Sequence, residues 1–325
     1  MRTLNRLLIA LVVGCIGLSA FSSELPAQTW PQRPVRVIVP LPPGTAIDVS
    51  ARLFGEHLSA RWKQPVIVEN VAGADGILAA KEFVNRHDDH TLLYSFAGLI
   101  TINPVLYEKL PYDPARDLAP IATSSDNFLA IAASKKAEVS SLDGLVKRAK
   151  AQPSKLNWAA TSGLPYFAFA GFQKTAGIDM VYVPYRDFNP ALADVGEGRI
   201  DVASTALTQM LPHSQAGKLT FLVVINRTRS PLAPQVPTAS EAGYPDLTFD
   251  GVTGYFGGRE MPAALRDRIA ADVRAVAEDK GVMERLAAMG IVARGSTPAE
   301  FAAAIEEQRT KVAAIAAALG TKPTQ

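Results

Sequence analysis

Two short loops in the N-terminal third of the chain combine glycine, hydroxyl and carboxylate residues in a way that suits anion binding. The first reads Pro42-Pro43-Gly44-Thr45 and connects an apolar run to a segment with helical spacing. Gly44 permits a tight corner, and the N–H groups after it begin a helix, where they lack partners at the positive end of the dipole. Thr45 adds a hydroxyl, and Asp48 can cap the helix or accept a hydrogen bond from a ligand or a water. On this loop alone, a capped turn without a ligand is an equal alternative.

The second loop repeats this pattern. Residues Gly73, Ala74, Asp75 and Gly76 again lead from a predicted strand into a predicted helix. Two donor-rich helix starts that face one cleft suit a carboxylate, because both of its oxygens accept hydrogen bonds. Phosphate is disfavoured, since neither loop has the Lys-Ser/Thr ending of a nucleotide-binding loop. The two loops therefore predict a carboxylate site.

Patterns for catalysis and metal binding are weak. Residues 87–90 read His-Asp-Asp-His, which is more typical of a solvated turn than of a metal site. The chain has no Gly-x-Ser-x-Gly, His-Glu-x-x-His or Gly-x-Gly-x-x-Gly motif. Ser162 and Asp201, expected near the cleft, could be imagined as a catalytic pair, but a receptor uses the same groups to orient a bound acid. We therefore expect a binding protein with no catalytic residue, metal or cofactor, and a secreted hydrolase is the disfavoured alternative.

These loops need a scaffold, and the chain after Gln28 supplies alternating strands and helices. The first series has strands over 35–39, 65–70 and 91–96 and helices over 48–62 and 76–86. The second has strands over 156–160, 180–185, 200–205 and 219–226 and helices over 141–152, 166–176 and 190–198. This alternation predicts parallel sheets covered by helices on both faces. From residue 262 the chain is almost wholly helical, with a helix start at Thr297, Pro298 and Glu300.

Two α/β units joined by two passes of the chain predict two lobes with a cleft between them. We place one lobe at residues 28–123 and 250–325, to which the C-terminal helices return, and the other at residues 124–249. Ligands of such sheets bind beyond the carboxyl ends of the strands, where the loops enter the helices.

Charge and cysteine content exclude several classes of protein. The formal net charge is only +2, from 33 basic and 31 acidic residues spread along the chain, so no field of one sign attracts nucleic acid. Cys15 is the only cysteine, which excludes a disulfide framework, a thiolate metal site and a cysteine nucleophile in the folded domains.

The N-terminus predicts export. Two arginines, an apolar run over residues 7–21 and the small residue Ala27 describe a signal peptide at residues 1–27. The run is shorter than the roughly 20 residues of a membrane-spanning helix. Cys15 stands in a sequence similar to a lipoprotein cleavage box, but the apolar run continues past it, which favours a cysteine within the signal core. We therefore expect a periplasmic protein, with a lipid anchor as the alternative.

Five separate blocks, in order, resemble a known family. They are "WPQRPVRVIVPLPPGTAIDVSARLF", "QPVIVENVAGADGILAAKEFV", "INPVLYEKLPYDPARDLAPIA", "VPYRDFNPALADVGEGRIDV" and "VPTASEAGYPDL". They are similar to the Bug receptors, the periplasmic solute receptors of tripartite tricarboxylate transporters, over nearly all of the chain after the signal peptide. The resemblance implies a type II, venus-flytrap binding protein whose first two loops hold a ligand carboxylate, partly through ordered waters. It also implies membrane permease subunits as partners, and we expect a monomer.

Together the loops and the resemblance give a set of expected ligand-binding residues in each lobe. In the first lobe they are Pro43, Gly44, Thr45, Asp48, Ala74, Asp75, Gly76, Ser95, Ala97 and Gly98. In the second lobe they are Thr161, Ser162, Gly163, Tyr166, Tyr185, Arg186, Asp187 and Asp201.

The chain also departs from the family at apolar positions, namely Leu99, Ile100, Leu164, Tyr166, Phe167, Phe188 and Val252. Each of these could equally fill a core. Taken together they predict a cleft with a more apolar and aromatic wall opposite the carboxylate, where a tricarboxylate would leave polar groups unpaired. We therefore expect a monocarboxylate or an aromatic carboxylate. A receptor that reports to a two-component kinase is the alternative function, because it would use the same closure of two lobes.

Overall fold

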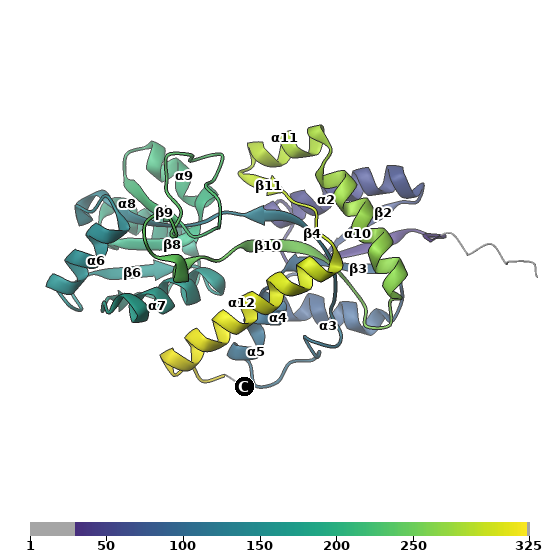
Figure 1. Cartoon of the computed structure of the whole chain (residues 1–325), viewed down its shortest axis with the longest axis horizontal. Coiled ribbons are helices and arrows are strands. Elements are labelled where there is room, and N and C mark those ends of the chain that lie inside the picture. Colours follow the sequence, from purple (N-terminus) through teal and green to yellow (C-terminus); the bar gives the residue numbers. More distant parts are fainter. Residues whose placement is uncertain (1–29, 324–325) are drawn as a thin grey trace, which may run out of the picture.

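The computed structural model describes residues 30–323, which form two β-sheets with helices on their faces (Figure 1). The predicted signal peptide and Cys15 lie outside the described residues. Within the described residues, no helix combines the length and the hydropathy needed to cross a membrane.

The first sheet has six strands in the order β11-β4-β10-β3-β1-β2. β1 (Val35–Val39), β2 (Val66–Asn70) and β3 (Thr91–Phe96) run parallel to one another. β10 (Gly251–Gly257) is antiparallel to β3 and to β4 (Ala119–Asn127), and β11 (Ile291–Ala293) is antiparallel to β4. The predicted parallel arrangement of β1, β2 and β3 is therefore confirmed. The sheet as a whole is mixed, because β10, which returns from the second sheet, and the short β11 run in the opposite direction.

Helices cover both faces of the first sheet. On one face, Val37 and Leu92 pack with residues of α2 (Ala46–Trp62) and α10 (Ala263–Ala277). On the other face, Ile38 packs with α3 (Ile77–Arg86). The remaining elements of this half are η1 (Ala74–Gly76), α4 (Gly98–Thr101), α5 (Asn103–Leu106) and α11 (Lys280–Ala288). The alternation of apolar residues along β1 thus fills two cores.

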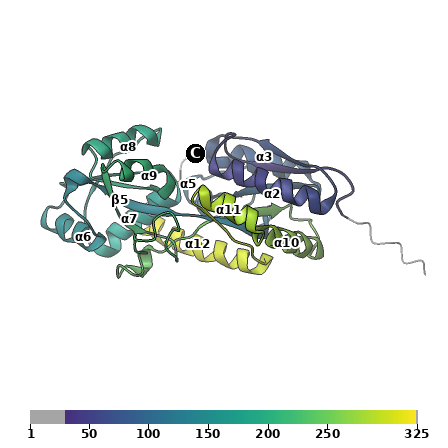
Figure 2. The same ribbon diagram turned by 90° about the horizontal axis from the view of Figure 1, so that it is seen from above.

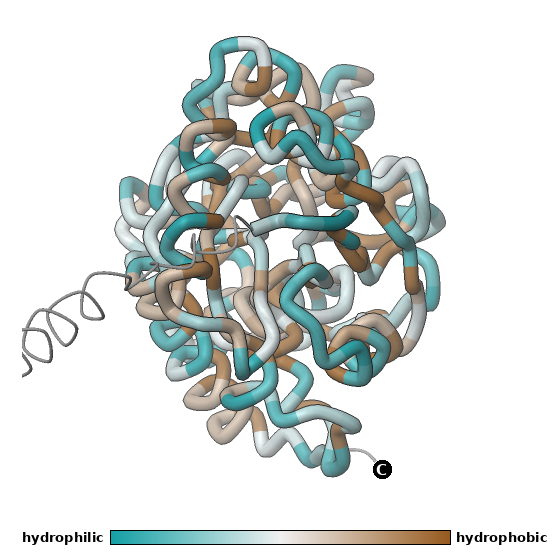
Figure 3. The backbone as a smooth tube through the Cα atoms, turned by 90° about the vertical axis from the view of Figure 1, so that its right-hand side faces the viewer, coloured by the Kyte–Doolittle hydropathy of each residue, from teal (hydrophilic) through white to brown (hydrophobic). Residues whose placement is uncertain are grey.

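The second sheet has five strands in the order β7-β6-β8-β5-β9. They are β5 (Leu129–Ser134), β6 (Asn157–Ala160), β7 (Val181–Tyr182), β8 (Val202–Ala206) and β9 (Leu219–Val224). β6 is parallel to β7 and β8, and β5 is antiparallel to β8 and β9. Its helices are α6 (Leu142–Ala151), α7 (Leu164–Ala176), α8 (Phe188–Glu197) and α9 (Leu207–Gln215), with η2 (Lys135–Ala137) and η3 (Pro245–Leu247). In Figure 3 hydrophobic and hydrophilic stretches alternate along the tube, as expected for elements buried on one side.

Two strand connections join the halves. β4 leads into β5 through Phe128, and the chain returns from β9 into β10. The side chain of Asn226 clamps the first connection, because its Oδ1 accepts from Leu129 N at 2.9 Å and its Nδ2 donates to Asn127 O at 2.9 Å. The predicted boundary at residue 123 falls inside β4, which stays in the first sheet as far as Asn127.

The last helix, α12 (Pro298–Leu319), spans both halves (Figures 1 and 2). Thr297 and Glu300 form the capping box that starts it, which confirms the predicted helix start. Phe301 packs in a core of the first sheet, whereas Val312 packs in a core of the second. The expectation that the C-terminal helices return to the first lobe is therefore correct for α10, α11 and the first part of α12, whereas the last part of α12 packs on the second sheet.

Candidate ligand-binding site between the two sheets

A cavity of about 210 Å³ lies between the halves and is lined by both. The first sheet and its loops contribute Phe96, Ala97, Gly98 and Ile102, and the second contributes Ser162, Gly163, Leu164 and Pro165. The strand connections and α12 contribute Asn127, Leu129, Gly251, Val252, Thr253 and Gln308. Four predicted site residues, Ala97, Gly98, Ser162 and Gly163, thus come together here. We call this space the interlobe cavity.

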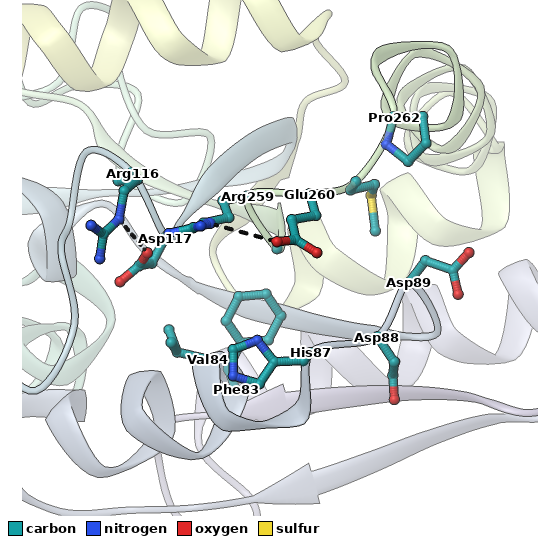
Figure 4. Close-up of a pocket in the computed structure, with 12 residues that line it drawn as sticks. Phe83, Val84, His87, Asp88, Asp89, Arg116, Asp117, Arg259, Glu260 and Pro262 are labelled. Atoms are coloured by element: carbon teal, nitrogen blue, oxygen red, sulfur yellow. Dashed lines mark hydrogen bonds and ion pairs between the residues drawn. The ribbon is translucent and has the colours of Figure 1, made fainter.

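A larger cavity of about 580 Å³ lies within the first half (Figure 4). Charged side chains line it, and four of them pair within the wall: Arg116 Nε lies 3.0 Å from Asp117 Oδ1, and Arg259 lies 3.9 Å from Glu260. No residue of the second half lines it. The interlobe cavity is the better candidate because residues from both halves can close on one ligand there.

The start of α7 presents backbone N–H groups that lack an intrahelical partner to the interlobe cavity. The first intrahelical bond runs from Phe167 N to Gly163 O at 3.1 Å, so the amides of Ser162, Gly163 and Leu164 precede the bonded part of the helix. Gly163 has φ 85° and ψ −137°, a conformation that favours glycine. A 13-residue helix thus directs the positive end of its dipole at the cavity.

The rest of the cavity wall is mostly apolar. Leu164 and Val252, two of the departures from the family, line it together with Phe96, Ile102 and Leu129. Its polar side chains are partly engaged: Asn127 Nδ2 donates to Thr253 Oγ1 at 3.1 Å, and Gln308 Nε2 donates to Thr101 Oγ1 at 2.8 Å. Among the described residues that line it, there is no lysine or arginine.

The other apolar departures lie elsewhere. Leu99, Ile100, Phe167 and Phe188 are buried in cores, each 9% exposed or less. Tyr166 stacks on Trp158, with ring centroids 5.6 Å apart. The predicted aromatic wall is therefore wrong, because these rings pack onto the second sheet and its helices, while the apolar wall comes from Leu164 and Val252.

The first predicted loop is held together internally. Asp48 is buried, and its carboxylate accepts from Gly44 N at 2.8 Å, from Arg52 Nε at 3.0 Å and from Asn70 Nδ2 at 2.8 Å. Burial would raise the pKa of Asp48, but the hydrogen bonds from Arg52, Gly44 and Asn70 outweigh it and lower the pKa. The Gly44 amide, expected to face a ligand, is thus occupied.

Thr45 and Pro43 complete this loop. Thr45 is the N-cap of α2; its hydroxyl donates to Pro42 O at 2.9 Å and accepts from Asp48 N at 3.4 Å. Pro43 is exposed on the surface of the loop. Of the two interpretations of this loop, the capped turn accounts for the contacts of Thr45 and Asp48.

The second predicted loop has an unusual backbone. Gly73, Ala74, Asp75 and Gly76 have φ values of 129°, 47°, 50° and 83°, all in the left-handed region. A Cβ on Gly76 would lie 2.9 Å from Leu99 Cδ2 and 3.2 Å from Pro40 Cβ. The loop is therefore packed against the carboxyl ends of β1 and β3, at the edge of the sheet that borders the interlobe cavity. We call residues 73–76 the second elbow.

The loop after β3 provides Ala97 and Gly98. Ala97 N donates to Val252 O at 3.2 Å, which joins this loop to β10. Ser95, also predicted as a ligand-binding residue, is fully buried within the sheet; its Oγ has no partner in the described chain, and it does not line the cavity.

In the second half, two polar residues near the predicted site residue Thr161, namely Thr205 and Gln209, were not predicted from the sequence. The Thr205 hydroxyl lies 3.2 Å from Thr161 Oγ1 and 2.6 Å from Gln209 Oε1. Thr205 is near the end of β8, next to Thr161 at the end of β6, so this cluster lies at the carboxyl edge of the second sheet. Only a pairing of β6 with β8 brings Thr205 to Thr161, and the sequence does not state that pairing.

Three predicted residues follow β7. The Tyr185 hydroxyl donates to Asp194 Oδ2 at 2.5 Å; burial and this bond raise the pKa of Tyr185 to about 12. Asp187 caps α8 by accepting from Asn189 N at 3.1 Å, and Arg186 is exposed. None of them lines the interlobe cavity.

Asp201, which was expected near the cleft together with Ser162, lies elsewhere. It pairs with Asn157 at the start of β6, where its Oδ2 accepts from Asn157 N at 2.8 Å and its own N donates to Asn157 Oδ1 at 2.8 Å. Ser162 follows the opposite end of β6. Asp201 and Ser162 are thus separated by the length of the strand, because Asp201 precedes β8 and does not end it.

Comparisons with known proteins find relatives over most of the chain. A family model described as "Tripartite tricarboxylate transporter family receptor" matches residues 50–321. The chain is 27% identical over 319 residues to the protein BugT of Bordetella pertussis, which covers 97% of this chain and 98% of BugT.

Solved structures are similar over most of the chain. A structure described as R. palustris Rpa4515 with adipate is 25% identical, with a TM-score of 0.76, and the match covers 91% of this chain and 100% of that one. MatC from Rhodopseudomonas palustris with bound malate is 27% identical, with a TM-score of 0.72 and coverage of 88% and 100%.

Proposed function

Because the chain belongs to the tripartite tricarboxylate transporter receptor family, whose members are periplasmic solute-binding proteins and not enzymes, we propose that it binds a small carboxylate with an apolar body. The ligand lies in the interlobe cavity, and the protein delivers it to membrane permease subunits. The protein acts as a monomer in the periplasm after removal of residues 1–27.

One observation carries this proposal: the start of α7 meets a mostly apolar cavity that both halves line. A carboxylate is stabilised by the free amides and the dipole of the helix, while Leu164 and Val252 contact the body of the ligand. Citrate is disfavoured because its further carboxylates would lose their water on binding. The described residues that line the cavity include no lysine or arginine that could pair with them. The similar proteins with adipate and with malate support a carboxylate of one kind or another.

The two halves are suited to closure around the ligand. Ile102 and Gly163 face each other across the cavity: a Cβ on Gly163 would lie 3.7 Å from Ile102 Cδ1. Rotation about the strand connections at Asn127–Leu129 and before Gly251 would open and close this contact. The closed form presents a surface to the permease that the open form lacks.

The ligand class is tested by titration calorimetry of the purified protein with adipate, malate, citrate, benzoate and nicotinate. We expect an apolar-bodied acid to bind and citrate to bind at least tenfold more weakly. Tight citrate binding without binding of any apolar-bodied acid would refute the ligand class.

The site is tested at Ser162, which is exposed beside the α7 amides. Ser162→Asp places a negative charge next to the ligand carboxylate, a repulsion of about 1.4 kcal/mol or more, so the affinity should fall at least tenfold. Ser162→Asn has nearly the same shape without the charge and should stay within about threefold of the wild type. Equal affinities for the two variants would mean that the carboxylate binds elsewhere.

A further inference from the structure

One polar side chain interrupts the buried face of α12. The buried residues of this helix are Phe301, Ile305, Gln308, Val312 and Ala316, which follow helical spacing along one face. Phe301 and Ile305 pack in a core of the first half, whereas Val312 and Ala316 pack in a core of the second. Gln308 therefore lies where α12 crosses from one half to the other, and it is only 8% exposed.

The amide of Gln308 lies at the interlobe cavity. Its Nε2 donates to Thr101 Oγ1 at 2.8 Å, and Thr101 belongs to α4, which also provides the lining residue Gly98. Gln308 lines a second cavity as well, of about 370 Å³, but no described residue of α4 lines that one. Because the amide is bonded to α4, the polar end of Gln308 is on the side of the interlobe cavity.

The bond to Thr101 fixes which end of the amide is left for a ligand. Thr101 Oγ1 donates its only hydrogen to Ala97 O at 3.1 Å, so toward Gln308 it can only accept. The NH₂ group of Gln308 must then face Thr101, and no residue in the described part of the chain donates to Oε1. A buried acceptor without a partner is costly, and a donor on a ligand would supply the missing bond.

Asn127 has the same arrangement in the cavity wall. Its Nδ2 donates to Thr253 Oγ1 at 3.1 Å, and its Oδ1 likewise accepts from no described residue. The described residues that line the cavity include no charged side chain, so an ammonium group or a second carboxylate would find no counterion there. The two free oxygens therefore suit a hydrogen-bond donor that carries no charge.

We propose that Gln308 is a specificity-determining residue, whose Oε1 accepts a hydrogen bond from an uncharged donor group on the ligand. This rests on the proposed function and narrows the ligand to an acid that carries a hydroxyl or a neutral N–H group besides its carboxylate. The carboxylate meets the amides at the start of α7, and the donor meets α12, which spans both halves. An acid without the donor leaves Oε1 without a partner once the cavity has lost its water.

Calorimetry with matched acids tests the proposal. Benzoate is compared with meta- and para-aminobenzoate, whose neutral amino group mainly donates, and with meta- and para-nitrobenzoate, whose nitro group only accepts. Hexanoate and its terminal hydroxy acid form a second, flexible pair. In wild type, at least one acid with a donor should bind at least tenfold more tightly than its parent, and the nitro acids should show no such gain.

Two variants separate a ligand contact from a purely structural role. Gln308→Met keeps the length of the side chain and removes the acceptor, so the preference for a donor should fall to within about threefold of the parent acid. Gln152→Met makes the same change at an exposed position and should keep the full preference. A purely structural role would weaken all acids alike, so an unchanged preference in Gln308→Met would overturn the proposal.

The orientation of the amide is tested without a ligand by nuclear magnetic resonance. The Nε2 hydrogens of Gln308 should exchange with solvent at least tenfold more slowly than those of the exposed Gln152, and Thr101→Val should abolish the difference. Equal exchange in wild type would overturn the proposal. If the acids bind wild type without preferring a donor, only the role of Gln308 fails, whereas if none of the acids binds, the proposed function fails with it.

Discussion

Replacing Asp48 by asparagine should destabilise the protein far more than a surface aspartate does, because its carboxylate is the centre of the first loop. The side chain is 2% exposed and accepts from Gly44 N, Arg52 Nε and Asn70 Nδ2. Gly44 N faces Oδ2 and Asn70 Nδ2 faces Oδ1. Asparagine has one oxygen and one NH₂ group, so one of these two donors would face another donor.

The expected magnitude follows from those contacts. A buried donor without a partner costs about 1–3 kcal/mol, and the loss of the charge-assisted bond to Arg52 adds about 1 kcal/mol. We therefore expect Asp48→Asn to lower the free energy of unfolding by about 2–4 kcal/mol. Asp143→Asn is the matched control: it also lies in the first turn of a helix with a basic residue four positions later, but it is exposed, so the change should stay below about 0.5 kcal/mol.

Urea titration followed by tryptophan fluorescence measures both variants, and pH gives a second check. The pKa of Asp48 is lowered by folding below 3.8, so its contribution is present above that pH and is lost as the pH falls through the folded value. The difference in the free energy of unfolding between wild type and Asp48→Asn should be constant from about pH 7 to pH 5 and should become smaller below about pH 4. A gap smaller than about 0.5 kcal/mol at neutral pH, or one equal to that of Asp143→Asn, would refute the role assigned to Asp48.

Two further predictions concern the contacts between the halves. Gly171→Ala should lower the free energy of unfolding by about 1–3 kcal/mol, because the new Cβ on α7 would lie 2.7 Å from Ile315 of α12. In a double-mutant cycle, Gly171→Ala should be nearly neutral when Ile315→Ala is also present, and additive effects would contradict the contact. Asn226→Ala should cost about 2–4 kcal/mol in urea titration, because Leu129 N and Asn127 O both lose their partner, and a stability equal to wild type would mean that the clamp is not formed.

Features that depend on neighbours along the chain could be predicted from the sequence. The capping box at Thr297 and Glu300 and the glycine corners at Gly44 and Gly76 are local, and the structure has them where the residues stand. The roles of Asp48 and Asp201 could not be predicted from neighbouring residues alone. Asp48 meets Asn70, 22 residues away, and Asp201 meets Asn157, 44 residues away, so their partners are set by strand pairing.

The dependence on contacts between distant segments also explains which features could not be predicted from the sequence. Gln308 and Thr101 are 207 residues apart, and no local pattern links an amide to a hydroxyl at that distance. The mixed direction of the first sheet depends on where β10 re-enters after a whole second sheet has formed. For apolar residues such as Phe167 and Phe188, the sequence does not distinguish a position in a core from a position in a cavity wall.

The placement of α12 has a consequence for biosynthesis. Phe301 and Val312 complete cores on either side of the molecule, yet both follow every strand of the two sheets along the chain. Neither half can finish folding before residues 301–312 have been made. A product shortened before residue 298 would expose apolar surface on both halves at once, so it would be recognised as unfolded throughout and would not persist as one intact half with a loose remainder.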